Sequence, residues 1–114
     1  MEAIKLERFN NLFMEQLNII LGSEVKNPLL KKVVINAVKI TNDLSIAKVY
    51  FTCFDEDRKL VLKELKDSSG FLRHELSNRI DIRHTPELTF LYDESLEYAK
   101  RIEDKIQEIN DKEK

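Results

Sequence analysis

The chain has few of the residues that break or cross-link a fold, with two glycines, two prolines and one cysteine among 114 residues. So little glycine and proline leaves no room for long linkers, and we expect one domain over residues 1–109 with a frayed charged tail at 110–114. Cys53 has no second cysteine, which excludes an internal disulfide and a cysteine-based zinc site and favours a reducing compartment. Because no secretory signal and no apolar run of roughly 20 residues is present, we expect a cytoplasmic protein with no membrane partner.

Motifs for catalysis are also missing, since the sequence contains no P-loop, GxGxxG, HExxH or GxSxG pattern. Cys53 ends an apolar stretch, where cysteine is usually a small buried hydrophobe. His74 and His84 lie in polar segments typical of a surface. The acidic run at residues 55–57 has the ligands of a divalent cation, but carboxylates at a helix start explain it without a metal. We therefore expect no enzyme, no cofactor, no metal site and no small-molecule substrate.

Charged residues are abundant, at 35% of the chain, but they are unevenly distributed. Residues 26–92 carry 12 basic and 9 acidic side chains, whereas both ends are net acidic and the whole chain has a net charge of −2. A basic middle permits nucleic-acid binding through one face. An excess of basic over acidic residues of this size is also common on an ordinary solvated surface that binds no nucleic acid.

The hydrophobic pattern predicts an α+β domain. We expect a helix at 5–21 capped by Gly22, a turn at Asn27-Pro28, a hairpin of strands 32–41 and 46–54, a strand at 88–92, and a last helix from Asp93 to about 109. A kinked helix pair lies between the second and third strands. The order α-β-β-α-kink-α-β-α predicts a three-stranded sheet with helices packed on it.

The kinked pair is the most informative segment. Apolar residues recur at helical spacing on both sides of Ser68-Ser69-Gly70, and these three residues weaken a helix. Lys63, Lys66, Gly70 and Arg73 are spaced by three and four, so a bend would gather the basic groups around one concavity suited to a phosphate backbone. A solvated helix face shows the same spacing, and on spacing alone both interpretations stay open.

The candidate RNA-binding residues are basic or small side chains at the kink, after it, and near the strands. They are Lys63, Lys66, Ser68, Ser69, Gly70, Arg73, Arg79, Arg83, Lys31, Lys32 and Lys48. Arginine can engage phosphate in a bidentate manner or stack on a base. The three lysines near the strands also suit exposed strand edges, where positive charge discourages aggregation.

Several segments, taken in order, resemble the ribosome-binding factor A family, a small bacterial assembly factor of the small ribosomal subunit. They are residues 38–50 with Asn42-Asp43-Leu44-Ser45, residues 69–73 (SGFLR), and residues 83–90 (RHTPELTF) followed by Asp93. The resemblance covers about residues 8–106 and implies a KH-like domain of the type II arrangement. In this family a helix-kink-helix with alanine, any residue and glycine replaces the GXXG loop of other KH modules. Ser68, Ser69 and Gly70 occupy that motif, with serine in place of alanine.

The resemblance further implies binding to the free, immature small ribosomal subunit and its rRNA during late maturation, including processing at the 5′ end. The alternative from the residues alone is a small protein-interaction module, whose sheet edge or C-terminal helix docks a partner without direct RNA contact. No heptad pattern exceeds the apolar stripe that the core needs, so we expect a monomer.

Overall fold

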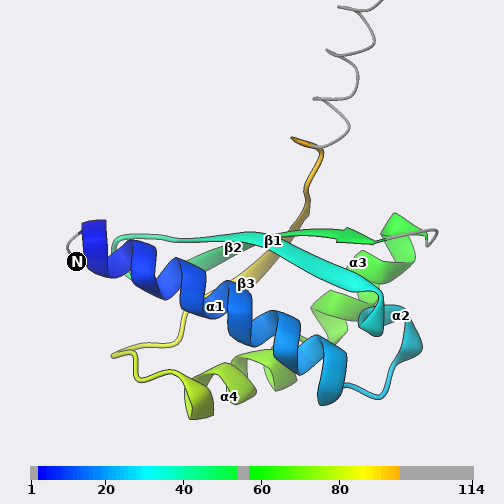
Figure 1. Cartoon of the computed structure of the whole chain (residues 1–114), viewed down its shortest axis with the longest axis horizontal. Coiled ribbons are helices and arrows are strands. Elements are labelled where there is room, and N and C mark those ends of the chain that lie inside the picture. Colours follow the sequence, from blue (N-terminus) through cyan, green and yellow to red (C-terminus); the bar gives the residue numbers. More distant parts are fainter. Residues whose placement is uncertain (1–2, 54–56, 96–114) are drawn as a thin grey trace, which may run out of the picture.

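The computed structural model describes residues 3–53 and 57–95 (Figure 1). Along the chain these form α1 (Ala3–Ser23), α2 (Pro28–Lys31), β1 (Val33–Ile40), β2 (Ile46–Cys53), α3 (Arg58–Asp67), α4 (Ser69–Arg79) and β3 (Glu87–Tyr92). The predicted α+β class, the hairpin and the third strand are confirmed. The expected last helix lies outside the described residues from residue 96 onward. No described helix is both long enough and apolar enough to cross a membrane.

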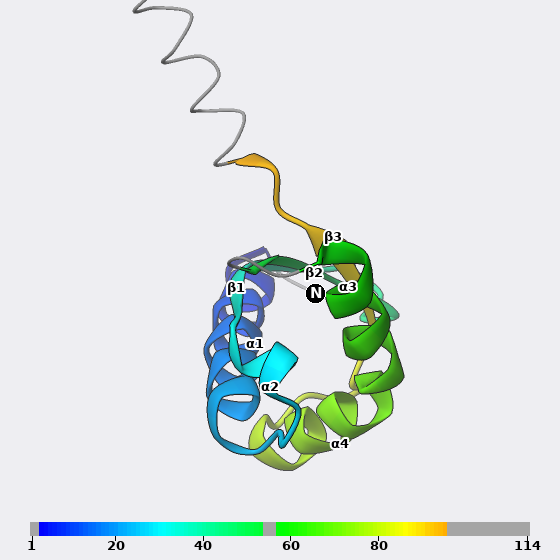
Figure 2. The same cartoon turned by 90° about the vertical axis from the view of Figure 1, so that its right-hand side faces the viewer.

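The sheet has β2 in its centre, antiparallel to β1 and parallel to β3. Helices α1, α3 and α4 all lie on one face of this sheet (Figures 1 and 2). Figure 2 shows α1 beneath the β1 side, α3 beneath the β3 side, and α4 closing the layer away from the sheet. Among the described elements no helix covers the opposite face.

The core fills the space between the sheet and the three long helices. The apolar stripes predicted for these helices are buried in it, with Leu17 of α1, Leu65 of α3 and Leu76 of α4 all fully inaccessible to solvent. Phe51 of the central strand belongs to the same core and is equally buried. Each such side chain stabilises the fold by roughly 1.5–3 kcal/mol, so the helix pair is fixed firmly against the sheet.

A bulge in β1 explains the imperfect alternation of apolar residues there. The pairing register shifts between Ile35 and Ala37, which leaves Asn36 as an extra residue. An inserted residue moves the inward-facing positions by one. The buried positions before and after the bulge are Val33, Ile35, Val38 and Ile40. One face of the strand is therefore apolar, although its sequence does not alternate strictly.

Two sequence expectations about the α1–β1 connection are wrong. Gly22 lies inside α1 and has no positive φ, so it is not a left-handed cap. Asn27-Pro28, expected as a turn, begins the short helix α2. The Oδ1 atom of Asn27 accepts a hydrogen bond from the Leu29 amide at 3.0 Å, and its Nδ2 donates to Oε2 of Glu64 in α3 at 2.9 Å. Asparagine at the cap and proline at the first helical position favour a helix start, and this signal outweighs the turn.

Candidate nucleic-acid interface

Helices α3 and α4 meet at Ser68, where the predicted kink is confirmed. Ser68 has φ −91° and ψ 0°, ends α3 and precedes α4. Its amide donates to the Glu64 carbonyl at 3.0 Å, and the Leu72 amide donates to the Ser68 carbonyl at 2.9 Å. The hydroxyl of Ser69 donates to the Lys66 carbonyl at 2.7 Å. Serine hydroxyls that bond back to the preceding turn often bend helices, so the hydroxyl of Ser69 favours the joint.

Gly70 follows the joint and is an ordinary helical residue. It lacks a positive φ, and a Cβ atom built on it would meet nothing within 4 Å. Neither the backbone conformation nor the internal packing therefore requires glycine here, although glycine within a helix costs up to about 1 kcal/mol relative to alanine. The bare backbone of Gly70 is open to a molecule approaching from outside.

Three lysines of α3 are exposed on one side of that helix. A hollow of about 260 Å³ is lined there by Lys59, Leu62, Lys63, Lys66 and Asp67. Gly70 and Arg73 line a different hollow. The expectation that the bend gathers Lys63, Lys66 and Arg73 around one concavity is therefore wrong. Spacings of three and four define a common face only on a straight helix, and the joint at Ser68 interrupts that face.

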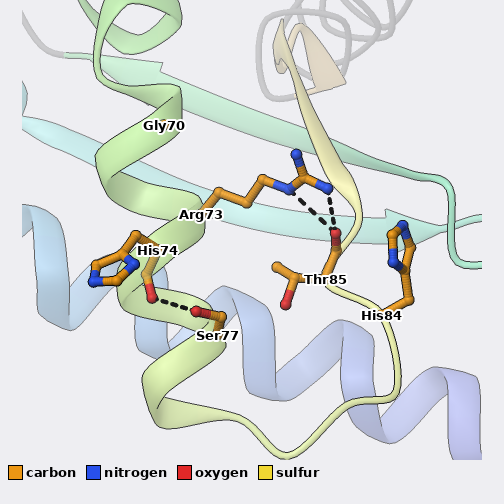
Figure 3. Close-up of a pocket in the computed structure, with 6 residues that line it drawn as sticks. All are labelled: Gly70, Arg73, His74, Ser77, His84 and Thr85. Carbon is orange, nitrogen blue, oxygen red and sulfur yellow. Dashed lines mark hydrogen bonds between the residues drawn. The ribbon is translucent and has the colours of Figure 1, made fainter.

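Arg73 is bonded to the protein's own backbone. Its Nε and Nη2 atoms donate to the carbonyl oxygen of Thr85 at 3.1 and 2.7 Å (Figure 3). The pair is partly buried and joins α4 to the segment that leads into β3. A hydrogen bond that a charged group donates to a carbonyl is stronger than one that a neutral group donates. Arg73 therefore positions this segment, a role that the helical spacing did not reveal.

The hollow beside this contact has a volume of about 380 Å³ and opens widely to solvent. It is lined by Gly70, Arg73, His74, Ser77, His84 and Thr85 (Figure 3). Both histidines are exposed, as expected; the His84 side chain lies on the same side of α4 as Arg73 and Thr85, whereas the His74 ring extends from the other side of the helix. The Ser77 hydroxyl donates to the His74 carbonyl at 2.6 Å, and Nε2 of His74 lies 3.4 Å from Nδ2 of Asn78. Sequence reasoning missed this hollow because its two sides are about ten residues apart.

Arg79 is engaged mainly with its neighbours. Its Nη2 lies 3.3 Å from a Glu24 carboxylate oxygen and its Nε lies 3.6 Å from Glu75. Its Nη1 also donates to Oε1 of Gln16 at 3.4 Å. These contacts link α4 to the C-terminal half of α1 and to Glu24, which follows that helix. Two carboxylates beside the guanidinium reduce the positive charge that this residue offers to an anion.

The other predicted residues lie in separate places. Arg83 is exposed in the segment before β3, and Lys31 and Lys32 are exposed where α2 passes into β1. Lys48 is exposed on the face of the sheet opposite the helices, since its neighbours in β2 are buried on the core side. The structure therefore does not bring these lysines to the kink.

Asp93, interpreted from the sequence as a structural cap, makes internal contacts. One carboxylate oxygen accepts from the Ser95 amide at 3.0 Å and the other from Nδ2 of Asn36 at 3.1 Å. Its hydrogen bonds with Ser95 are the main cause of a pKa below the ordinary aspartate value. Asp93 therefore ties the end of β3 to the bulge in β1.

The chain was compared with known proteins. Residues 5–106 match the family model described as Ribosome-binding factor A. Ribosome-binding factor A of Staphylococcus epidermidis is 40% identical over 116 residues, which covers all of both chains. The crystal structure of ribosome-binding factor A from Thermus thermophilus is 27% identical, with a TM-score of 0.61, over 73% of this chain and 94% of that chain.

A second structural comparison concerns the fold alone. It is a homology model of Thermus thermophilus ribosome-binding factor A, fitted into a cryo-electron-microscopy map of a 30S complex. It superposes with a TM-score of 0.66 at 24% identity, over 78% of this chain and 96% of that chain. The arrangement of sheet and helices is thus one that these structures share.

Proposed function

The chain belongs to the ribosome-binding factor A family, and we propose that it binds the free, immature small ribosomal subunit through its rRNA. The protein is an assembly factor and not an enzyme. In this proposal it assists late maturation, including processing of the 5′ end of small-subunit rRNA, while another protein cuts the RNA. Support comes from the family membership and from the 30S complex into which the Thermus thermophilus relative was fitted.

One observation carries the proposal, namely the bare backbone of Gly70 directly after the joint between α3 and α4. KH modules hold an RNA backbone against a glycine-containing helix-loop-helix, where a side chain would keep the RNA away. The exposed Lys63 and Lys66 lie on the preceding helix and can neutralise phosphates nearby. An exposed protein backbone flanked by positive charge is better suited to contact the sugar-phosphate backbone of RNA than to contact the surface of another protein.

The mechanism needs only binding energy. A factor that prefers immature rRNA to mature rRNA shifts the folding equilibrium by its differential affinity, and it leaves when that preference is lost. A tenfold preference corresponds to about 1.4 kcal/mol. The acidic ends of the chain weaken nonspecific attachment to polyanions, so affinity depends on the shape of the rRNA as well as on salt.

The test is co-sedimentation of the purified protein with free small subunits and with complete ribosomes at several salt concentrations. We expect selective association with free small subunits that weakens as salt rises. Lys66→Glu should reduce the association, and Lys26→Glu, an exposed lysine between α1 and α2, is the matched control. Failure of the folded protein to associate with any ribosomal particle would overturn the proposal.

The alternative, a protein-interaction module, has one observation in its favour. The open face of the sheet exposes the apolar side chains Val34, Ile46 and Leu91. The outer edge of β1, by contrast, is occupied by Asn10 and Asn18 of α1, which leaves less backbone for an added strand. Association that is insensitive to salt and abolished by polar substitutions on the open face would favour this alternative.

A further inference from the structure

The hollow lined by Gly70, Arg73, His74, Ser77, His84 and Thr85 is a fixed feature of the fold (Figure 3). The two hydrogen bonds from the Arg73 guanidinium to the Thr85 carbonyl hold the segment before β3 against α4. Pro86, the next residue, is buried and limits movement of this segment further. A site whose sides are fixed before binding loses less conformational entropy when a ligand enters.

The chemistry of the lining narrows the class of ligand. None of the six lining residues carries a carboxylate, which argues against a cation, and most of the exposed lining surface belongs to carbon atoms, which argues against a bare phosphate. The imidazole of His84 and the planar guanidinium of Arg73 are flat groups of the kind that stack on unpaired bases. The volume of about 380 Å³ lies within the usual range of small-ligand sites, about 300–1,000 Å³.

We propose that this hollow, the histidine hollow, holds one unstacked nucleobase of single-stranded RNA, in contact with the imidazole of His84. The inference rests on the proposed function and deepens it, because it names the part of the RNA that lies beside the kink. The backbone of the same nucleotide then passes Gly70, where no side chain obstructs it. The site recognises a strand whose bases are free, which a fully paired helix does not offer.

The experiment is NMR titration of the isotopically labelled full chain with two single-stranded RNA oligonucleotides of about six nucleotides. One carries all its bases, and the other has the same length and charge but no bases. We expect the first to shift the imidazole Cε1–Hε1 signal of His84 together with the Gly70 amide. The abasic strand should shift signals from the α3 lysines and from the Gly70 amide, which its backbone passes, and leave the His84 imidazole unchanged.

Substitution supplies an independent readout. His84→Ala removes an exposed side chain and should weaken binding of the base-bearing strand about tenfold, the scale of one lost stacking contact. Its affinity for the abasic strand should not change. Asn11→Ala, an exposed position on α1, is the control and should match the natural chain with both strands.

The outcomes separate this inference from the proposed function. If the abasic strand shifts the His84 imidazole as strongly as the base-bearing strand, the hollow holds phosphate and the nucleobase inference is overturned. If neither strand shifts the His84 imidazole while the protein still sediments with small subunits, the inference fails and the proposed function stands. If neither strand binds and sedimentation also fails, both are overturned.

Discussion

The side chain of Asn18 forms two hydrogen bonds with the main chain of Ile35. Its Oδ1 accepts from the Ile35 amide at 2.8 Å, and its Nδ2 donates to the Ile35 carbonyl at 3.0 Å. Asn10, two turns earlier on α1, accepts from the Ile40 amide at 2.9 Å. The asparagine amides thus take the place that a neighbouring strand would occupy. Because β1 is an edge strand, this contact both fixes α1 and reduces the backbone available for edge-to-edge pairing.

Asn18→Leu should destabilise the protein by about 1–3 kcal/mol, since it leaves an amide and a carbonyl of Ile35 without their partner in a partly buried position. The measurement is the midpoint of urea unfolding. Asn11→Leu introduces the same side chain at an exposed position of α1, and its unfolding free energy should stay within about 0.5 kcal/mol of the natural chain. Equal midpoints for the two variants would contradict a stabilising role for the Asn18 contact.

Gly70→Ala should stabilise the fold and weaken binding to small subunits. The added methyl group meets nothing within 4 Å, and alanine favours a helix by up to about 1 kcal/mol. The same methyl group obstructs an RNA backbone at the kink. Thermal unfolding and co-sedimentation measure the two effects.

Gly22→Ala is the matched control for this prediction. Gly22 is also helical, lacks a positive φ and has open space around its Cβ position, but it lies in α1. It should raise stability without changing sedimentation. If Gly70→Ala sediments as strongly as Gly22→Ala, the kink does not contact the RNA.

From the sequence alone, Lys66→Glu and Arg73→Glu are equivalent charge reversals. Both are expected to weaken binding and to leave the fold intact. The structure distinguishes them. Lys66 is exposed, so its reversal should leave the unfolding free energy within about 0.5 kcal/mol of the natural value. Arg73→Glu breaks the bonds to the Thr85 carbonyl and should cost about 1.5–3 kcal/mol. Urea unfolding of both variants, beside sedimentation, tests this difference, and equal stabilities would refute the positioning role of Arg73.

Asp43 should make the hairpin turn sensitive to acid. Hydrogen bonds from the hydroxyls of Ser45 and Thr41 lower the pKa of its carboxylate to about 2. In the unfolded chain an aspartate has a pKa of about 3.9. Because the folded pKa is the lower one, the contribution is fully present above about pH 4 and is lost as pH falls towards 2. Asp43 is exposed, so solvent screens this contribution.

The measurement is Tm between pH 2 and pH 6 for the natural chain and for Asp43→Asn. The advantage of the natural chain should shrink across that window. The lowered pKa of Asp93 acts in both proteins and cancels in the difference. An advantage that stays constant down to pH 2 would contradict the assigned pKa.

The sequence by itself determined the elements whose causes lie within a few residues. Apolar spacing predicted α1, the two arms of the kinked pair and β3, and the serines predicted the joint between α3 and α4. Asp57 caps α3 by accepting from the Lys59 amide at 2.9 Å, as the acidic helix start indicated. Each of these features is determined by residues close together in the sequence, within a turn of helix or within a short alternating stretch. The helix α2 was missed although Asn27-Pro28 carries a local helix-start signal, because the same dipeptide is also typical of a turn.

Only the tertiary structure decided which partner each polar side chain takes. An arginine on a helix face has the same local pattern whether it meets a phosphate or the carbonyl of Thr85, and Asn18 has the same pattern whether it meets water or a strand edge. The histidine hollow likewise exists only because the chain folds back after α4 and brings His84 and Thr85 to Gly70 and Arg73. Periodicity constrains which face a side chain occupies, whereas its partner depends on segments 12 or more residues away, whose approach is set by packing of the whole core.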